Sequence, residues 1–172
     1  MAAVEFALLA PLLALLFLAT ADLGLWLRGH FRLGRAATQL GNIVTQQNSL
    51  DADSLAALFG AGQQMAAPLD VTGAQGATIL SAIGGTGTAN VMLWQRRIGA
   101  AEFTSRFGTP GQAVVLPGQG VLPSGQTLIV AEMFSKGQAW VLSRGLMGSG
   151  GPGTITAMAL YRPRGATLAE AP

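Results

Sequence analysis

The chain has 172 residues, of which half are hydrophobic and 10% are charged, with ten Lys and Arg against eight Asp and Glu. Soluble domains usually carry about 25% charged residues, so this composition excludes an ordinary soluble surface and indicates cover by lipid or by other subunits. The small basic surplus, without a clustered basic face, argues against a nucleic-acid partner, and the absence of cysteine excludes disulfides, thiol nucleophiles and cysteine metal sites.

The N-terminus holds the most hydrophobic segment. Residues 6–21 read FALLAPLLALLFLATA, and no charge lies between Glu5 and Asp22. Together with the apolar residues that follow, this segment can form a helix that spans a hydrocarbon core of about 30 Å, at about 1.5 Å per residue. Trp26 and Arg28 are expected to be membrane-interface anchors at its far end.

Three interpretations of this segment compete: a secretory signal peptide, an ordinary signal anchor and an assembly helix. A signal peptide begins with basic residues, whereas no Lys or Arg precedes Arg28 here and an acid stands at position 5. The Glu5 carboxylate is costly inside an apolar helix unless it is paired. The α-amino group of a neighbouring chain would be a suitable partner if identical helices packed side by side with an axial offset, which favours an assembly helix.

The chain begins MAAVEFALLAPLLALLFLA. This beginning resembles a mature type IV pilin or pseudopilin, and most closely the TadE-like family of the tight-adherence (type IVc) pilus. The resemblance implies that Met1 is the first mature residue and that Glu5, at the fifth position and followed by Phe6, pairs with the N-terminal amine of an adjacent subunit. Met1, Glu5 and Phe6 are therefore the expected assembly residues.

The resemblance also implies a precursor whose short basic leader, ending in Gly, is cut by a prepilin peptidase. The helix would then wait in the bacterial inner membrane, with the C-terminal domain in the periplasm. From there the assembly platform and other pilin-like subunits would take it into an extracellular pilus. Arg28, Arg32 and Arg35 follow the span, so the positive-inside rule applied to this chain alone predicts the opposite orientation. A removed basic leader would reconcile the two.

The helical pattern continues beyond the span. Apolar residues recur at spacings of three and four, which predicts one apolar stripe on a long helix from about Ala2 to Gln47: Leu33, Ala36, Ala37, Leu40, Ile43 and Val44. Pro11 indicates a harmless kink or a hinge, and Asp22 is taken to mark the membrane exit. The only histidine, His30, has no second histidine or nearby acid and is expected to face solvent or headgroups.

A short helix and a set of strands follow. Residues 48–51 read NSLD, a break with N-cap residues, and the pattern predicts a helix over 51–65 that Pro68 ends. Strands separated by Gly-rich turns are expected at 77–83, 90–97, 126–134, 139–143 and 154–162. The fold class is therefore α+β: a long helix, with its first half transmembrane, and a short helix packed on a C-terminal antiparallel sheet. We expect a division into residues 1–27, for membrane and assembly, and residues 28–172, a periplasmic or extracellular domain.

No catalytic, cofactor or metal site is expected. The chain lacks a Gly-x-Ser-x-Gly elbow and a P-loop ending, and the Gly-rich stretches at 84–87 and 148–153 read as loops. Glu102 and Glu132 are isolated in sequence. The basic pairs at 96–97 and 162–164 are interpreted as solvated strand ends and not as one patch.

The leading hypothesis is a non-enzymatic minor pilin or pseudopilin that initiates or supports pilus assembly and contributes to surface adhesion. Segments 94–96, 122–132 and 159–164 add weaker TadE-like resemblances in the expected order. The alternatives are a pilus-tip adhesive module, for which Trp140 and Arg144 near the 148–153 loop are the hints, and a membrane-anchored domain of another function, such as an anchored enzyme.

Overall fold

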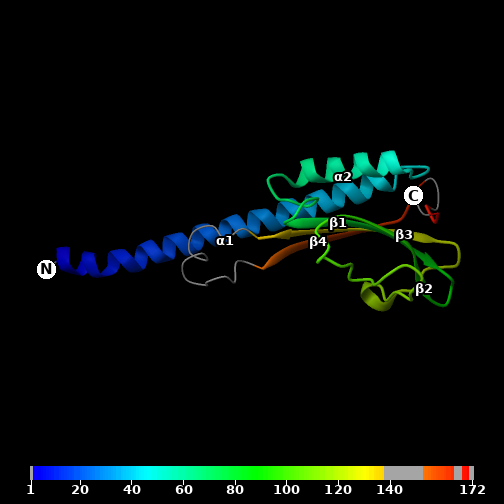
Figure 1. Cartoon of the computed structure of the whole chain (residues 1–172). Helices are drawn as coiled ribbons and strands as arrows, with labels where there is room; N and C mark the ends of the chain where they lie inside the picture. Colours follow the sequence, from blue (N-terminus) through cyan, green and yellow to red (C-terminus); the bar gives the residue numbers. More distant parts are fainter. Residues whose placement is uncertain (1, 138–152, 165–167, 171–172) are drawn as a thin grey trace.

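The computed structural model describes residues 2–137, 153–164 and 168–170. Within these residues two helices precede a sheet of four strands, and a short 3₁₀ turn lies between the second and third strands (Figure 1). This arrangement confirms the predicted α+β class. The elements in chain order are α1 (Ala2–Val44), α2 (Ala52–Ala66), β1 (Gly76–Gly85), β2 (Asn90–Gly99), η1 (Pro117–Gln119), β3 (Thr127–Lys136) and β4 (Thr154–Tyr161).

The first helix dominates the shape of the molecule. α1 has 43 residues, a length of about 64 Å at 1.5 Å per residue, and its N-terminal half projects beyond the other elements (Figure 1). It ends at Val44, three residues before the predicted end. The backbone N–H groups of Gln46 and Gln47 donate to carbonyls three residues earlier, which closes the helix with a tighter turn.

The second helix begins with a reciprocal cap. The Asp51 carboxylate accepts the backbone N–H of Ser54 at 2.7 Å, and the Ser54 hydroxyl accepts the backbone N–H of Asp51 at 3.2 Å. Each bond satisfies a donor that the helix leaves free. Asp51 is therefore the N-cap, and the helix starts one residue after the predicted position.

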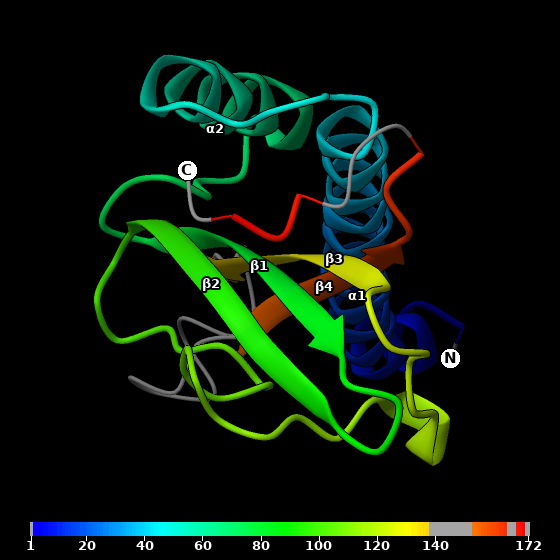
Figure 2. The same ribbon diagram turned by 90° about the vertical axis from the view of Figure 1, so that its right-hand side faces the viewer.

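The sheet is antiparallel with the strand order β2-β1-β3-β4. One face carries α1, which lies against β4 and β3, and α2 packs beside α1 (Figure 2). The predicted stripe of α1 is buried here, in a core that it shares with α2 and the sheet. The largest fully buried side chains of this core are Leu33, Leu40, Val44, Val71, Leu80, Ile129 and Met133.

The opposite face of the sheet is covered by the long connection between β2 and β3. Phe107, Val114, Leu116 and Leu122 of this connection pack on side chains of the strands that include Ile83. Both faces of β1 and β3 are therefore buried along almost their whole length. This burial explains why the two strands read as nearly continuous apolar runs and not as a clear alternation.

Four of the five predicted strands have counterparts in the structure, with ends that differ by at most two residues. The fifth, at 139–143, lies outside the described residues, as do Trp140, Arg144 and all but the last residue of the 148–153 loop.

Candidate functional site

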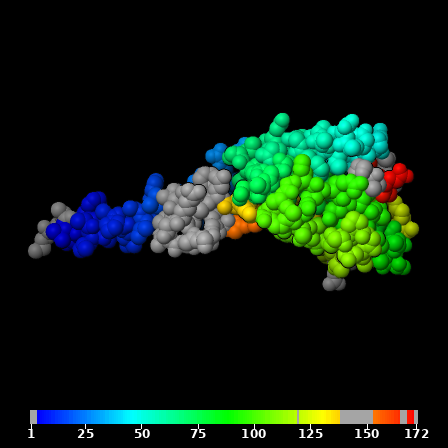
Figure 3. Space-filling view, in the orientation of Figure 1, coloured from blue at the N-terminus to red at the C-terminus, as the bar shows by residue number. Residues whose placement is uncertain are grey.

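The N-terminal half of α1 has no packing partner among the residues that the structure describes. An 18-residue window of this helix has a mean hydropathy of 2.2 and none of it is buried. The helix is long and apolar enough to cross a membrane, and in the space-filling view its blue N-terminal part extends well beyond the sheet domain (Figure 3). Such a surface needs lipid or other helices around it. Its exposed large side chains are Val4, Phe6, Leu8, Leu9, Leu12, Leu13, Leu15, Leu16, Phe17 and Leu23.

Glu5 lies in the first turn of α1, at the tip of this apolar surface. Its side chain is exposed, no basic side chain in the described part of the chain lies within ion-pair distance of it, and Phe6 beside it is 66% exposed. A negative charge is favourable in the first turn of a helix, and at the edge of an apolar surface it is further stabilised by a partner of opposite charge. That partner has to come from outside the described chain. Met1, the third predicted assembly residue, lies outside the described residues.

Two features of the span concern its backbone. α1 runs through Pro11 without an interruption, although proline lacks the N–H that the carbonyl of Ala7 would accept in a regular helix. Further along, the Thr20 hydroxyl donates to the Leu16 carbonyl at 2.8 Å, which satisfies this polar group within the helix.

Trp26 and His30 form a pair at the end of the apolar segment. Their ring centroids lie 5.0 Å apart, with an interplanar angle of 35°, as expected for neighbours four positions apart on one helix face. Trp26 is 38% exposed. His30 therefore has an aromatic neighbour, and the described residues include no group of three or more side chains that could hold a metal ion.

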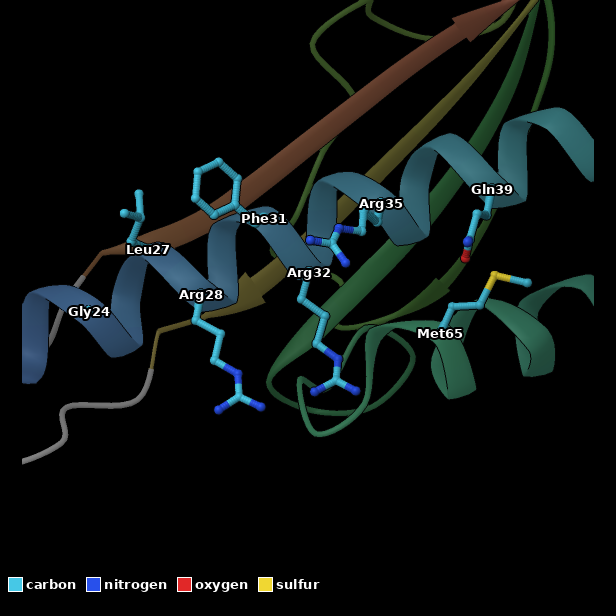
Figure 4. Close-up of a pocket in the computed structure, with 8 residues that line it drawn as sticks. All are labelled: Gly24, Leu27, Arg28, Phe31, Arg32, Arg35, Gln39 and Met65. Atoms are coloured by element: carbon cyan, nitrogen blue, oxygen red, sulfur yellow. The ribbon is translucent and has the colours of Figure 1, made fainter.

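A basic groove follows directly. Arg28 and Arg32 extend side by side from the same side of α1 (Figure 4). Both are exposed, and so is Arg35, one turn further along the helix. None of them forms an ion pair with a described residue. Positive charge that has no ion-pair partner among the described residues therefore gathers where the apolar segment ends. The groove is lined by Gly24, Leu27, Arg28, Phe31, Arg32, Arg35 and Gln39 of α1 and by Met65 of α2.

A buried acid on β3 has a structural arrangement that the sequence did not indicate. Glu132 is 1% exposed; its carboxylate accepts the Ser105 hydroxyl at 2.5 Å and the backbone N–H of Arg106 at 3.1 Å. The Arg106 side chain donates in turn to the hydroxyl of Thr156 on β4, at 2.5 Å. Glu132 therefore fastens the β2–β3 connection to the sheet. The available signal was an acid in the middle of an otherwise apolar run of β3.

The other charged groups stay apart. Glu102 pairs with Lys136 at 2.7 Å, with both side chains about half exposed, so the two isolated glutamates have separate partners. Arg96 and Arg97 lie on β2, and Arg162 and Arg164 follow β4, at the opposite edge of the sheet. The two basic pairs therefore form no common patch, as the sequence interpretation expected.

The connection between β2 and β3 has a long uncharged part. No charged residue occurs from 107 to 131. Val115 is 78% exposed and Val121 is 50% exposed, beside a shallow pocket. The Asn90 side chain holds this loop by donating to the Gly120 carbonyl and accepting the Leu122 N–H, each at 2.8 Å.

Comparison with known proteins returns one family for the helix described above. Residues 1–41 match the family model of TadE-like proteins, which confirms the resemblance stated for the N-terminus. The matched range includes the whole apolar segment, the basic groove residues of α1 and most of the buried stripe. No curated protein and no solved structure matches the chain. The match shows what the N-terminal segment, residues 1–41, is similar to.

Proposed function

We propose, on the premise of a TadE-like N-terminal segment, that the protein is a minor pilin or pseudopilin that initiates or supports assembly of a tight-adherence pilus. The observation that carries the proposal is the unburied half of α1, whose apolar side chains have no cover in the described chain and which matches the TadE-like family. Prepilin peptidase would release the mature N-terminus, and other pilin-like subunits would supply the missing cover. Residues 28–172 would then form the domain outside the inner membrane.

Glu5 is the residue that would direct the assembly. An unpaired carboxylate at the apolar end of a helix is costly in lipid, and the α-amino group of Met1 in a neighbouring subunit would neutralise it. The exposed Phe6 ring would pack on that neighbour. Because the pairing joins two chains, it favours a bundle of helices over a single anchored helix.

The test compares Glu5→Ala with the unaltered chain by co-purification from membranes of the native host. We expect the variant to remain in the membrane after carbonate extraction but to lose its pilin-like partners and reduce piliation. Asp22→Ala is the matched control, since it removes an acid from another face of the same helix. If Glu5→Ala keeps its partners and piliation is normal, the span is a plain anchor.

The orientation has its own test, because the chain contains no cysteine. Ser124 is exposed in the turn before β3, so a Ser124→Cys variant carries a single accessible thiol. We expect a membrane-impermeant maleimide to label it in cells whose outer membrane alone is permeabilised. Labelling only after the inner membrane is broken would place the domain in the cytoplasm.

A pilus-tip adhesive module is the second candidate. Uncharged loops and two exposed valines occupy the end of the domain away from the apolar helix, where an adhesive contact would have to lie. A Val115→Ser, Val121→Ser variant should then reduce attachment of cells to surfaces while incorporation into pili is unchanged. If attachment is unchanged, the adhesive role is contradicted and only the assembly role remains.

A further inference from the structure

The basic groove lies at a defined depth relative to the apolar segment. From Phe6 to Leu27 the helix has 22 residues and is about 33 Å long, which matches a hydrocarbon core of about 30 Å. The headgroup layer beyond that core is about 5–7 Å thick on each side. Arg28 therefore lies at the start of this layer, and Arg32 about 6 Å further along the helix axis.

The groove combines the groups that a phospholipid headgroup needs. Arg28 and Arg32 project on one side of α1 (Figure 4), and guanidinium groups bind phosphate oxygens with paired hydrogen bonds. The exposed Leu27 and Phe31 side chains, 44% and 60% exposed, offer an apolar border. At Gly24 nothing lies within 4 Å of the position that a Cβ would occupy, so the helix surface is open where an acyl chain would begin.

We propose that this groove binds the headgroup of an anionic phospholipid, with the lipid phosphate between Arg28 and Arg32 and the acyl chains along the apolar half of α1. The inference rests on the membrane insertion of α1 in the proposed function. An anionic lipid is the occupant because two arginines, Arg28 and Arg32, meet an apolar helix surface at headgroup depth, and no described acidic side chain pairs with them. Arg35 lies about 10 Å from the start of the layer, beyond its outer border.

The experiment is native mass spectrometry of the full chain in detergent, titrated with phosphatidylglycerol and with phosphatidylcholine of the same acyl chains. We expect the unaltered chain to prefer phosphatidylglycerol. An Arg28→Gln, Arg32→Gln variant should lose this preference by about 5-fold per arginine, about 25–30-fold for the pair, as expected for basic residues at an anionic membrane surface. The matched control is Arg162→Gln, Arg164→Gln, which removes two exposed arginines beyond β4 and should keep the preference.

Three outcomes would overturn the proposal. Equal retention of both lipids by the unaltered chain would show no selectivity for charge. An equal loss in the control variant would show a general effect of net charge. Displacement of phosphatidylglycerol by millimolar inorganic phosphate would show a site for the free anion. Carbonate extraction of the same variants separates this result from the proposed function. A chain that stays in the membrane but shows no lipid preference contradicts only the proposal of a lipid site.

Discussion

Tyr161 of β4 packs directly on Gly41 of α1, so closely that a Cβ at Gly41 would lie 2.8 Å from Cδ2 of the ring and 3.7 Å from the Ala131 side chain. This contact joins the last strand of the sheet to the buried half of the long helix. Glycine in a helix interior costs up to about 1 kcal/mol relative to alanine. The close approach of Tyr161 explains why glycine nevertheless occupies position 41. The contact also holds α1 at the distance that the core around Leu40 requires.

We therefore predict that Gly41→Ala destabilises the domain. The added methyl group forces the Tyr161 ring or the helix to move, and such overpacking costs about 1–3 kcal/mol. In a thermal melt of the full chain in detergent, this corresponds to a fall in Tm of at least about 2 °C for a chain of this size. Gly34→Ala is the control on the same helix: nothing lies within 4 Å of its Cβ position, so improved helix propensity should leave Tm unchanged or raise it.

Removal of the Glu132 charge should loosen the β2–β3 connection. Glu132→Gln keeps the size of the side chain but weakens its bonds from Ser105 and Arg106, and hydrogen bonds to a charged group contribute about 1.5–3 kcal/mol each. We expect faster amide hydrogen exchange in residues 100–126 and a lower free energy of unfolding. Glu102→Gln removes an exposed ion-pair partner and should change stability by less than about 1 kcal/mol. Equal effects of the two variants would contradict the role assigned to Glu132.

The elements that could be predicted from the sequence are those whose apolar residues recur at a helical spacing or form an unbroken run. The stripe from Leu33 to Val44 gave the buried half of α1, and the capping residues near Asp51 gave the start of α2 to within one residue. In both cases the signal lies within one short segment. Assignment of Glu5 and Phe6 to assembly depended on resemblance and stays a prediction, since a single chain contains no partner subunit.

The layer over the second face of the sheet could not be predicted in this way. Its apolar side chains, such as Phe107 and Leu122, stand between Gly and Pro residues without a helical or strand period. Ser105 donates a hydrogen bond to Glu132, which lies 27 positions later in the chain, and no local sequence pattern predicts such a contact. The basic groove was only partly predicted. Arg28 was taken as an anchor, and its spacing of four from Arg32 places both on one side of α1, whereas the position of Met65 in the groove depends on how α2 packs.

Acid should weaken the domain through Asp70. Burial by itself would raise the pKa of this carboxyl, but the backbone N–H groups of Gln75, Gly73 and Thr72 donate to it at 2.9, 2.7 and 3.2 Å and hold the pKa below its ordinary value. A lowered pKa contributes stability above the unfolded value of about 3.9, and this contribution is lost as the pH falls through the folded value.

The Asp70→Asn variant should therefore be less stable than the unaltered chain at pH 7 and lose less stability between pH 5 and pH 3, in urea titrations at each pH. Asp53→Asn removes an acid from the exposed side of α2, makes the same change in net charge and keeps the Asp70 bonds. Its stability should depend on pH as steeply as that of the unaltered chain. A variant at Asp70 with an unchanged pH dependence would contradict this account.

Truncation of α1 tests where the domain begins. A chain of residues 28–172 loses only helix residues that are not part of the described core, whose first α1 member is Leu33. We expect it to fold without detergent and to show a cooperative thermal transition. A chain of residues 42–172 also loses Leu33, Ala36, Ala37 and Leu40. Loss of a buried leucine side chain alone costs about 2–5 kcal/mol, against a total stability of about 5–15 kcal/mol. The shorter chain should therefore show no cooperative transition, and a transition in both chains would place the core of the domain outside the helix.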